Sequence, residues 1–313
     1  MMKLGVNDFS ESFGIDHRKI PPRTLDLILE HDFQLLEMSY LDREGQLLNI
    51  IDFIRHDKKS VLSLERQWVW DQGWSENLDE FRSLPPLGKN IKALTPKFIR
   101  SNEIIRWKNK FWRTTNPDFE IDYIHVLREF IFETYFSSVS TLCEFGAGSG
   151  HNLLHASYSL PNIHLIGTDY AASAVQLMRE VGISKGLSLA VNQFDIRTPH
   201  DSSLKLPREC GVLTMCAIEQ VGDNFANFFD FLINSKVQIC VNVEPTNEFF
   251  DLTILEDYLA AWFQGKRGYP TTIARKLYEL ESKNLIRIHT IKRLNFGSKF
   301  SEGYNLFVWS PIN

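Results

Sequence analysis

Short apolar runs alternate with amphipathic stretches along the chain from Leu142 onward. Each run has the length of a β-strand, and the stretches between runs repeat their apolar residues at helical spacing. This alternation is typical of an α/β fold. After a first strand that begins near Leu142, the predicted strands are residues 163–169, 187–195, 212–218 and 237–243. The predicted helices between them are residues 152–159, 173–181 and 225–233.

The C-terminal part of the chain follows a different pattern. Helices are predicted over residues 252–263 and 271–283, and the second carries Ile273, Leu277 and Leu280 at helical spacing. Strands over residues 286–294 and 304–309 are joined by a short glycine-containing segment, which favours an antiparallel hairpin over a crossover. The pattern therefore predicts a Rossmann-like, seven-stranded mixed sheet with an antiparallel C-terminal hairpin.

The apolar pattern of residues 1–119 lacks the alternation of strands and helices seen in the rest of the chain. These residues are predicted to form a helical cap, which precedes an α/β domain over residues 120–313. Helical spacing occurs over residues 25–38 and 46–54, and residues 120–136 form an amphipathic helix that packs on the sheet. Most of the tryptophans lie in the cap. Packing against the sheet is the simpler account of them, and a lid over a bound ligand is the alternative. These tryptophans are Trp68, Trp70, Trp74, Trp107 and Trp112.

The charge composition narrows the range of partners. A formal net charge of −5 over 313 residues, with a pI near 6.0, fits a small or neutral substrate better than a nucleic acid. Basic residues gather between Lys89 and Arg113 and at Lys266 and Arg267, where solvated surface is the expected explanation. The first residues lack the apolar core of a signal peptide, and no segment approaches the roughly 20 apolar residues that span a bilayer. We therefore expect a cytoplasmic protein that does not bind membranes.

The four cysteines predict neither a disulfide framework nor a metal site. They have no C-x-x-C spacing and mostly lie inside apolar runs, so we expect buried free thiols and no bound metal. They are Cys143, Cys210, Cys216 and Cys240.

The most informative segment follows the first strand, where an acidic residue precedes three alternating glycines. Gly146, Gly148 and Gly150 form G-x-G-x-G, a turn in which the backbone can approach a ligand before a helix begins. The dinucleotide-binding pattern is G-x-G-x-x-G, in which the third glycine would fall at position 151. That position is His151, which argues against NAD or FAD.

These features resemble the class I S-adenosylmethionine-dependent methyltransferases over roughly residues 120–313. Members of that family have seven strands with a final antiparallel pair, a first motif acid-x-G-x-G-x-G, and acids that end the second and third strands. Glu144, Asp169 and Asp195 occupy these places. The resemblance implies that S-adenosylmethionine is the cofactor.

The resemblance also implies roles on the adenosine side of the cofactor. Asp169 would accept hydrogen bonds from the ribose hydroxyls, since a carboxylate has acceptors only. Asp195 and Ile196 would address the adenine edge and face, and Tyr170 the opposite face. A helix cap is the alternative role for Asp169.

On the methionine side, the glycine loop would allow close approach, with Glu144 oriented toward the ammonium group. Cys216 and the residues up to Glu219 would line the cofactor beside the transferred methyl. Arg106, Trp107 and Trp112 are the cap residues expected nearest the cofactor. The predicted loop contacts are Gly146, Ala147, Gly148 and Gly150.

Methylation of a hydroxyl requires a base to take its proton, and four residues are candidates. Glu219 follows the fourth strand, where the acceptor lies in this fold, and Glu244 ends the fifth. His151 follows the last glycine, and His200 is the weaker histidine candidate. The alternatives are that Glu219 caps a turn or contacts the cofactor, and that His151 caps or packs at the helix start.

The acceptor class is narrowed by a motif that the sequence lacks. Residues 217–222 read Ala-Ile-Glu-Gln-Val-Gly, without the Asp/Asn-Pro-Pro-Tyr/Phe element of enzymes that methylate amino groups of bases or of glutamine. We therefore predict O-methylation of a small polar acceptor such as a sugar. The alternatives are methylation of a protein or peptide side chain, and a non-catalytic relative of the fold.

Overall fold

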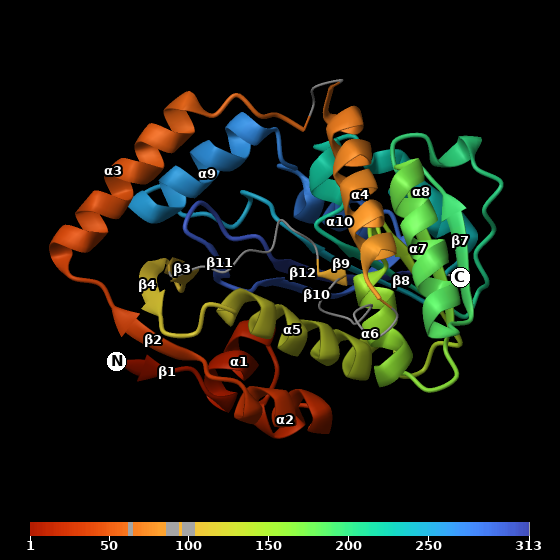
Figure 1. Cartoon of the computed structure of the whole chain (residues 1–313), viewed down its shortest axis with the longest axis horizontal. Coiled ribbons are helices and arrows are strands. Elements are labelled where there is room, and N and C mark those ends of the chain that lie inside the picture. The colour runs from red at the N-terminus through yellow and green to blue at the C-terminus, as the bar shows by residue number, and fades with distance from the viewer. Residues whose placement is uncertain (62–64, 86–93, 96–103, 313) are drawn as a thin grey trace.

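A central sheet has seven strands in the order β10-β12-β9-β8-β5-β6-β7 (Figure 1). Pairing is parallel from β9 through β8, β5 and β6 to β7, whereas β12 is antiparallel to both β9 and β10. The predicted mixed sheet and its antiparallel final pair are confirmed. This computed structural model describes residues 1–61, 65–85, 94–95 and 104–312. The strands are β5 (Thr141–Phe145), β6 (His164–Asp169), β7 (Leu189–Gln193), β8 (Cys210–Met215), β9 (Ile239–Glu244), β10 (Ile286–Arg293) and β12 (Asn305–Pro311).

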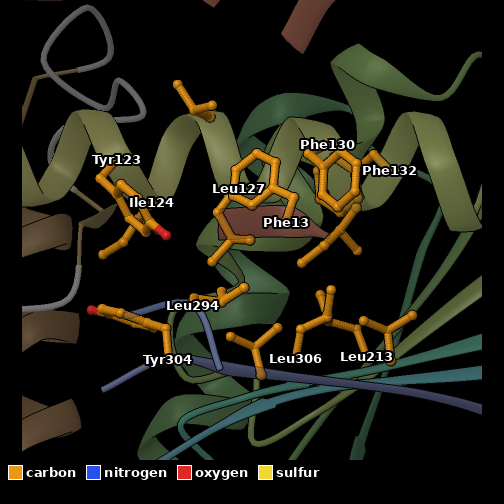
Figure 2. Close-up of a cluster of buried hydrophobic side chains, with 14 of the residues drawn as sticks. Phe13, Tyr123, Ile124, Leu127, Phe130, Phe132, Leu213, Leu294, Tyr304 and Leu306 are labelled. Atoms are coloured by element: carbon orange, nitrogen blue, oxygen red, sulfur yellow. The ribbon is translucent and has the colours of Figure 1, made fainter. Parts of the chain in front are cut away.

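Helices cover both faces of this sheet, so its central strands are apolar on both sides. All five residues of β5 are buried, and successive side chains point to opposite faces of the sheet, as the two-residue period of a strand requires. Leu142 lies in the first hydrophobic core, between the sheet and α5, and Cys143 lies in the second core, on the other face. Leu213 and Leu306 meet α5 residues such as Leu127 across the first core (Figure 2). The helices of this part are α5 (Phe119–Tyr135), α6 (His151–Ser159), α7 (Ala172–Lys185), α8 (Ala226–Ser235), α9 (Leu255–Arg267) and α10 (Ile273–Ser282), with short 3₁₀ turns η4 (Pro199–Asp201) and η5 (Ile218–Val221).

The N-terminal part is not purely helical, because it contains most of a second sheet. The sheet has the order β1-β2-β4-β3-β11, and β11 comes from the connection between β10 and β12. Its strands are β1 (Met2–Lys3), β2 (Gln34–Glu37), β3 (Ile104–Trp107), β4 (Lys110–Thr114) and β11 (Phe296–Ser298). The helices are α1 (Val6–Phe13), α2 (Pro22–Glu30), α3 (Tyr40–His56) and α4 (Glu65–Ser83), with the 3₁₀ turn η1 (His17–Lys19).

The helix predicted over residues 25–38 is wrong beyond Glu30. Residues of β2 pair with β4 instead, and this pairing buries Leu35 completely. A strand of four residues carries too little alternation to be distinguished from a helix by its pattern, and the non-local pairing decides between them.

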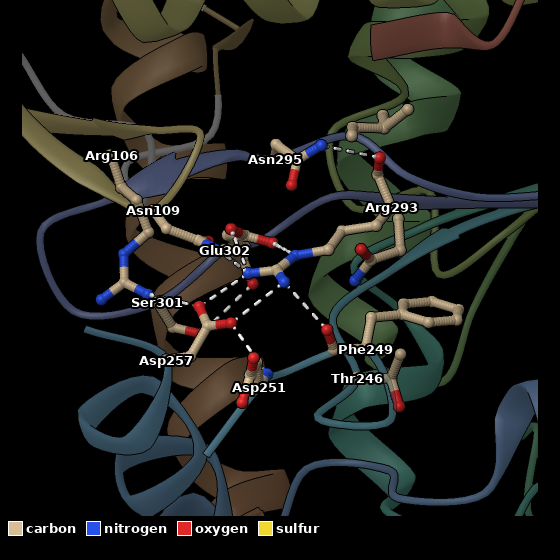
Figure 3. Close-up of polar contacts among 12 residues, drawn as sticks. Arg106, Asn109, Thr246, Phe249, Asp251, Asp257, Arg293, Asn295, Ser301 and Glu302 are labelled. Carbon is tan, nitrogen blue, oxygen red and sulfur yellow. Dashed lines mark hydrogen bonds and ion pairs between the residues drawn. The ribbon is translucent and has the colours of Figure 1, made fainter. Parts of the chain in front are cut away.

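A buried ionic network joins the second sheet, α9 and the final hairpin (Figure 3). Arg293 on β10 is paired with Asp257 on α9 at 2.6 Å and with Glu302 at 2.7 Å, and it also donates to Asn109 Oδ1. Arg106 on β3 is completely buried, lies 3.7 Å from Asp257 and donates to the Glu256 carbonyl oxygen at 2.8 Å. Arg106 therefore belongs to this junction.

Other residues named in the sequence predictions also have structural contacts. Trp107 is buried with its ring 6.2 Å from that of Tyr123, which agrees with the packing interpretation, and Trp112 Nε1 donates to the Trp107 carbonyl oxygen. Lys266 donates to the Ile54 carbonyl oxygen and Arg267 pairs with Asp57, so these two join α9 to the end of α3 instead of facing only solvent. Much of the stretch between Lys89 and Arg113 lies outside the described residues.

The cysteines form no disulfides among the described residues. The cysteine thiols are free, and Cys143, Cys210 and Cys240 are buried while Cys216 is partly exposed. Within the described part of the chain, no helix combines the length and the apolar character needed to cross a bilayer.

Candidate active site

The predicted cofactor residues meet at one edge of the central sheet. The five strands β5 to β9 are parallel, so their carboxyl ends lie at the same edge. Glu144 lies near the end of β5, Asp169 ends β6, and Glu244 ends β9. Cys216 follows β8 directly, and Asp195 lies two residues after β7. The structure therefore brings these five residues to the edge where α/β sheets bind ligands.

The glycine loop has the backbone conformation that the pattern predicts. Gly146 and Gly148 have φ values of +71° and +55°, in the left-handed region that favours glycine. A Cβ at position 146 would lie 2.5 Å from Ala217 Cβ, and one at position 148 would lie 2.3 Å from the Trp74 ring. Both glycines are thus also required by neighbouring protein atoms, and Gly148 lies directly against the indole of Trp74.

Asp169 is buried and holds the loop to the start of α7. Its Oδ2 accepts from the Gly148 N–H and its Oδ1 from the Ala171 N–H, both at 3.0 Å. Burial raises the pKa of Asp169 to about 6, against the effect of the backbone hydrogen bonds. The alternative of a helix cap is wrong, because Ala171 occupies the N-cap position of α7 and the contact of Asp169 with this helix is to the N–H of that residue, ahead of the first helical turn. Because each carboxylate oxygen has two acceptor sites, further hydrogen bonds from a ligand remain compatible with these contacts.

Glu144 is the least satisfied acid of the site. Its side chain is 1% exposed, Oε1 accepts from Asn152 Nδ2 at 2.6 Å, and Oε2 has no hydrogen-bond partner among the described residues. Burial raises its pKa to about 8, although Asn152 and the nearby Arg128 oppose this shift. A buried acceptor without a partner is costly, and a cationic ligand group beside it would remove that cost.

The predicted adenine residues form a second group. Asp195 is paired with Arg197 through Oδ2 and Nη2 at 2.5 Å, and the Arg197 guanidinium lies 5.9 Å from the Tyr170 ring centroid. Burial raises the pKa of Asp195, but the hydrogen bonds from Arg197 outweigh it, so the pKa lies below its ordinary value. Ile196 is buried in the second core. Arg197 was not among the residues predicted from the sequence, although its position two residues after an acid is the available signal.

The segment after β8 is shaped by Glu244. This side chain is completely buried and accepts from the backbone N–H groups of Ala217 and Glu219, both at 3.2 Å. Burial raises the pKa of Glu244 to about 7. Cys216 has φ +56°, a left-handed conformation that is unusual for a residue other than glycine and occurs preferentially at functional sites. Glu244 thus fixes the turn that carries Glu219, and Glu219 itself is partly exposed.

Two residues near this turn were not found by sequence reasoning. Tyr304 and Glu120 are both buried, and the Tyr304 hydroxyl lies 3.1 Å from Glu120 Oε1. Burial raises the pKa of Tyr304 well above its ordinary value, and Glu120, Cys216 and Glu219 add to the effect electrostatically. Glu120 lies at the start of α5 and Tyr304 directly before β12, so no local motif joins them.

His151 lies between α5 and α6. The residue is 8% exposed, and its Nδ1 is 3.2 Å from Arg128 Nη1. Burial and the positive charge of Arg128 hold its pKa well below the ordinary value, so the imidazole is neutral. These contacts correspond to the packing alternative, and its catalytic role stays a prediction.

Helix α4, which carries three of the cap tryptophans, covers the glycine loop. Asp71 accepts from the N–H and the hydroxyl of Ser173 at the start of α7, and Arg82 pairs with Glu180 further along that helix at 2.6 Å. Trp74 lies between these contacts, against Gly148. Two of the cap tryptophans, Trp70 and Trp74, are therefore at the candidate site.

Among the described residues, no group of three or more His, Cys, Asp or Glu side chains is arranged to hold a metal ion.

Comparison with known proteins concerns the fold of the chain. No family model and no curated protein matches it. Mitomycin 7-O-methyltransferase MmcR is 12% identical, with a TM-score of 0.44 over 99% of this chain and 88% of that one. Magnesium protoporphyrin IX methyltransferase of Synechocystis PCC 6803 is 12% identical, with a TM-score of 0.46 over 62% of this chain and 84% of that one. The pyocyanin biosynthetic protein PhzM is 11% identical, with a TM-score of 0.44 over 63% and 59% of the two chains. Likeness at this level is limited to the fold and assigns no acceptor.

Proposed function

We propose that this chain, which has the seven-stranded class I methyltransferase fold, is an S-adenosylmethionine-dependent methyltransferase that acts on a hydroxyl of a small polar acceptor. One observation carries the proposal. The glycine loop, Asp169 and Glu144 converge at the carboxyl edge of the parallel strands, and one Glu144 oxygen is buried there without a partner among the described residues.

The donor groups at this edge fit the proposed cofactor. Glu144 Oε2 would accept from the ammonium group of its amino-acid part, which removes the cost of the unpartnered acceptor. Asp169, which already orients the loop through Gly148, would accept from the ribose hydroxyls. When bound, S-adenosylmethionine supplies a methyl group on a positively charged sulfur.

Glu219 is the proposed base. Its carboxylate is partly exposed, next to the Cys216 thiol and the Tyr304 phenol, whereas Glu244 is fully buried and engaged with the turn. Glu219 would take the proton of the acceptor hydroxyl as the oxygen attacks, and Glu244 would hold the turn in place.

The groups around Glu219 support a neutral or cationic acceptor. Glu120, Tyr304 and Cys216 are acids or weak acids, and they interact electrostatically with one another and with Glu219. Ionised carboxyl groups of Glu120 and Glu219 repel an anion, and the phenol and thiol, which stay uncharged because their pKa values are raised, offer hydrogen bonds to a polyhydroxylated molecule.

Calorimetric titration with S-adenosylhomocysteine tests the cofactor assignment. We expect binding by the native chain, and a loss of about 2–3 kcal/mol in binding free energy in Asp169→Ala, because charge-assisted hydrogen bonds are lost. Asp230→Ala, at an exposed position on α8, is the matched control and should bind as the native chain does. Absence of binding by the folded native chain would remove the proposal.

A second experiment addresses the acceptor. The chain is incubated with methyl-labelled S-adenosylmethionine and a cell extract, and the products are separated by size. Label in small molecules supports the proposed acceptor class. Label in protein instead supports the alternative of side-chain methylation and contradicts the small acceptor.

A further inference from the structure

A chain of two hydrogen bonds runs from α4 to the proposed base. Trp70 Nε1 donates to Gln220 Oε1 at 2.7 Å, and Gln220 Nε2 donates to Glu219 Oε1 at 2.5 Å. The three side chains are partly exposed, and they connect α4 to the turn η5 that follows β8.

The chemistry of the two end groups fixes the orientation of the Gln220 amide. An indole N–H can only donate, and an ionised carboxylate can only accept. The amide must therefore place its oxygen toward Trp70 and its nitrogen toward Glu219. The reversed orientation would oppose donor to donor and acceptor to acceptor, so the usual ambiguity of amide flips does not arise.

The same helix is fixed on the glycine loop. The ring of Trp70 is stacked near that of Trp74, with 6.4 Å between centroids and 24° between planes, and Trp74 lies against Gly148. One turn of α4 thus contacts the loop that is proposed to hold the cofactor and, through Gln220, the proposed base.

We propose that Trp70 and Gln220 are positioning residues for Glu219, so that the seating of α4 on the glycine loop holds this carboxylate in the orientation for proton transfer. This inference rests on the proposed function, because it gives a role to the base of that reaction. Trp70 acts through Gln220, and neither residue needs to touch the acceptor.

Other titratable groups lie around Glu219, and their negative charge, when they are ionised, raises the pKa of this carboxyl, whereas the hydrogen bond from Gln220 lowers it. The Cys216 thiol and the Tyr304 phenol interact with it electrostatically, Glu120 acts on both of these groups, and Glu244 accepts its backbone N–H. Asp71 on α4 is engaged with Ser173. Ionisation of any of these groups disfavours the charged form of Glu219, whereas the N–H of Gln220 favours it.

The test follows the ionisation of Glu219 directly by carbon NMR, on full-length chain labelled at the glutamate side-chain carboxyls. The Glu219 resonance is identified by its absence in Glu219→Gln. In Gln220→Leu, which removes the donor, we expect the pKa of Glu219 to rise by about half a unit to one unit. In Trp70→Phe, which keeps a ring but removes the N–H, we expect a smaller rise, because the amide is no longer held.

Trp68→Phe is the matched control, since Trp68 lies on the same helix with 67% of its surface exposed, and it should leave the titration unchanged. An unchanged Glu219 titration in both Gln220→Leu and Trp70→Phe would overturn the inference while S-adenosylhomocysteine binding by the native chain upholds the proposed function. Absence of that binding removes the proposed function whatever the titration shows. If Gln220→Leu does not fold, Trp70→Phe alone decides.

Discussion

At the scale of single residues, the protonation state of the Glu144 carboxyl is expected to change when a ligand binds. Burial raises its pKa to about 8, and Oε2 lacks a hydrogen-bond partner among the described residues. The carboxyl is therefore mostly protonated near neutral pH in the free chain. Because the pKa of this carboxyl is raised on folding, its contribution to the free energy of unfolding is fully present below its ordinary pKa of 4.5, and the contribution is lost progressively as the pH rises to about 8.

A cation placed beside Glu144 should reverse this state. We expect binding of S-adenosylhomocysteine at pH 7 to release up to about one proton, because an adjacent ammonium group favours the ionised carboxylate. Calorimetry in two buffers of different ionisation enthalpy measures the release.

Glu144→Gln is the diagnostic variant for this prediction and should release far less. Asp169, with a pKa raised to about 6, is already largely ionised at pH 7 and contributes little. The same release from Glu144→Gln as from the native chain would show that another group loses the proton.

At the scale of elements, α4 packs on α7 through a buried apolar cluster that includes Trp74, Leu78 and Phe81. Asp71, Trp74 and Arg82 add contacts to α7 or to the glycine loop along the length of the helix. Most of the stability of a helix in a folded protein comes from such tertiary packing. The seating of α4 should therefore respond to loss of the central contact.

Trp74→Ala should loosen α4 without unfolding the sheet. A buried tryptophan replaced by alanine costs about 3–5 kcal/mol, so amide protection in α4 should fall by about 100-fold or more if this cost is local. Hydrogen exchange read by mass spectrometry measures the effect, with amides of β5 and β8 as the internal reference. Trp68→Ala, at the exposed position, should leave exchange unchanged, and equal protection of α4 in Trp74→Ala would refute this account.

At the scale of the whole molecule, the second sheet and the α/β domain are one assembly. β11 leaves the final hairpin to pair with β3, and Arg293 links that hairpin to α9 and the β3–β4 turn through Asp257 and Asn109. The side chains of Asp257 and Glu302 are completely buried, whereas that of Arg293 is 16% exposed, so the two acids depend on this cation.

Arg293→Met should lower the free energy of unfolding by about 3–5 kcal/mol, because Asp257 and Glu302 are left buried without their principal cation. Chemical denaturation measures the loss. Arg287→Met, at an exposed position on the same strand, should stay within about 0.5 kcal/mol of the native chain. Adding Glu302→Gln to Arg293→Met should recover part of the loss, and full additivity of the two losses would contradict the coupling.

The sequence by itself determined the features that depend on neighbours along the chain. Alternation of apolar runs and helical spacing predicted the seven-stranded sheet, and the glycine spacing with Glu144 and Asp169 predicted where its polar edge lies. Such patterns can be read locally because the period of a strand or helix and the conformation of a glycine turn are set by adjacent residues.

The tertiary structure alone decided which distant segments meet. The short strands β1 to β4 carry little pattern, and their pairing with β11 is non-local, so the sheet in the cap was not predicted. The contacts of Trp74 with Gly148, of Tyr304 with Glu120, and of Trp70 with Gln220 join segments about 70 to 180 residues apart. No local pattern encodes such contacts, because they exist only after the core has packed and brought the two segments together.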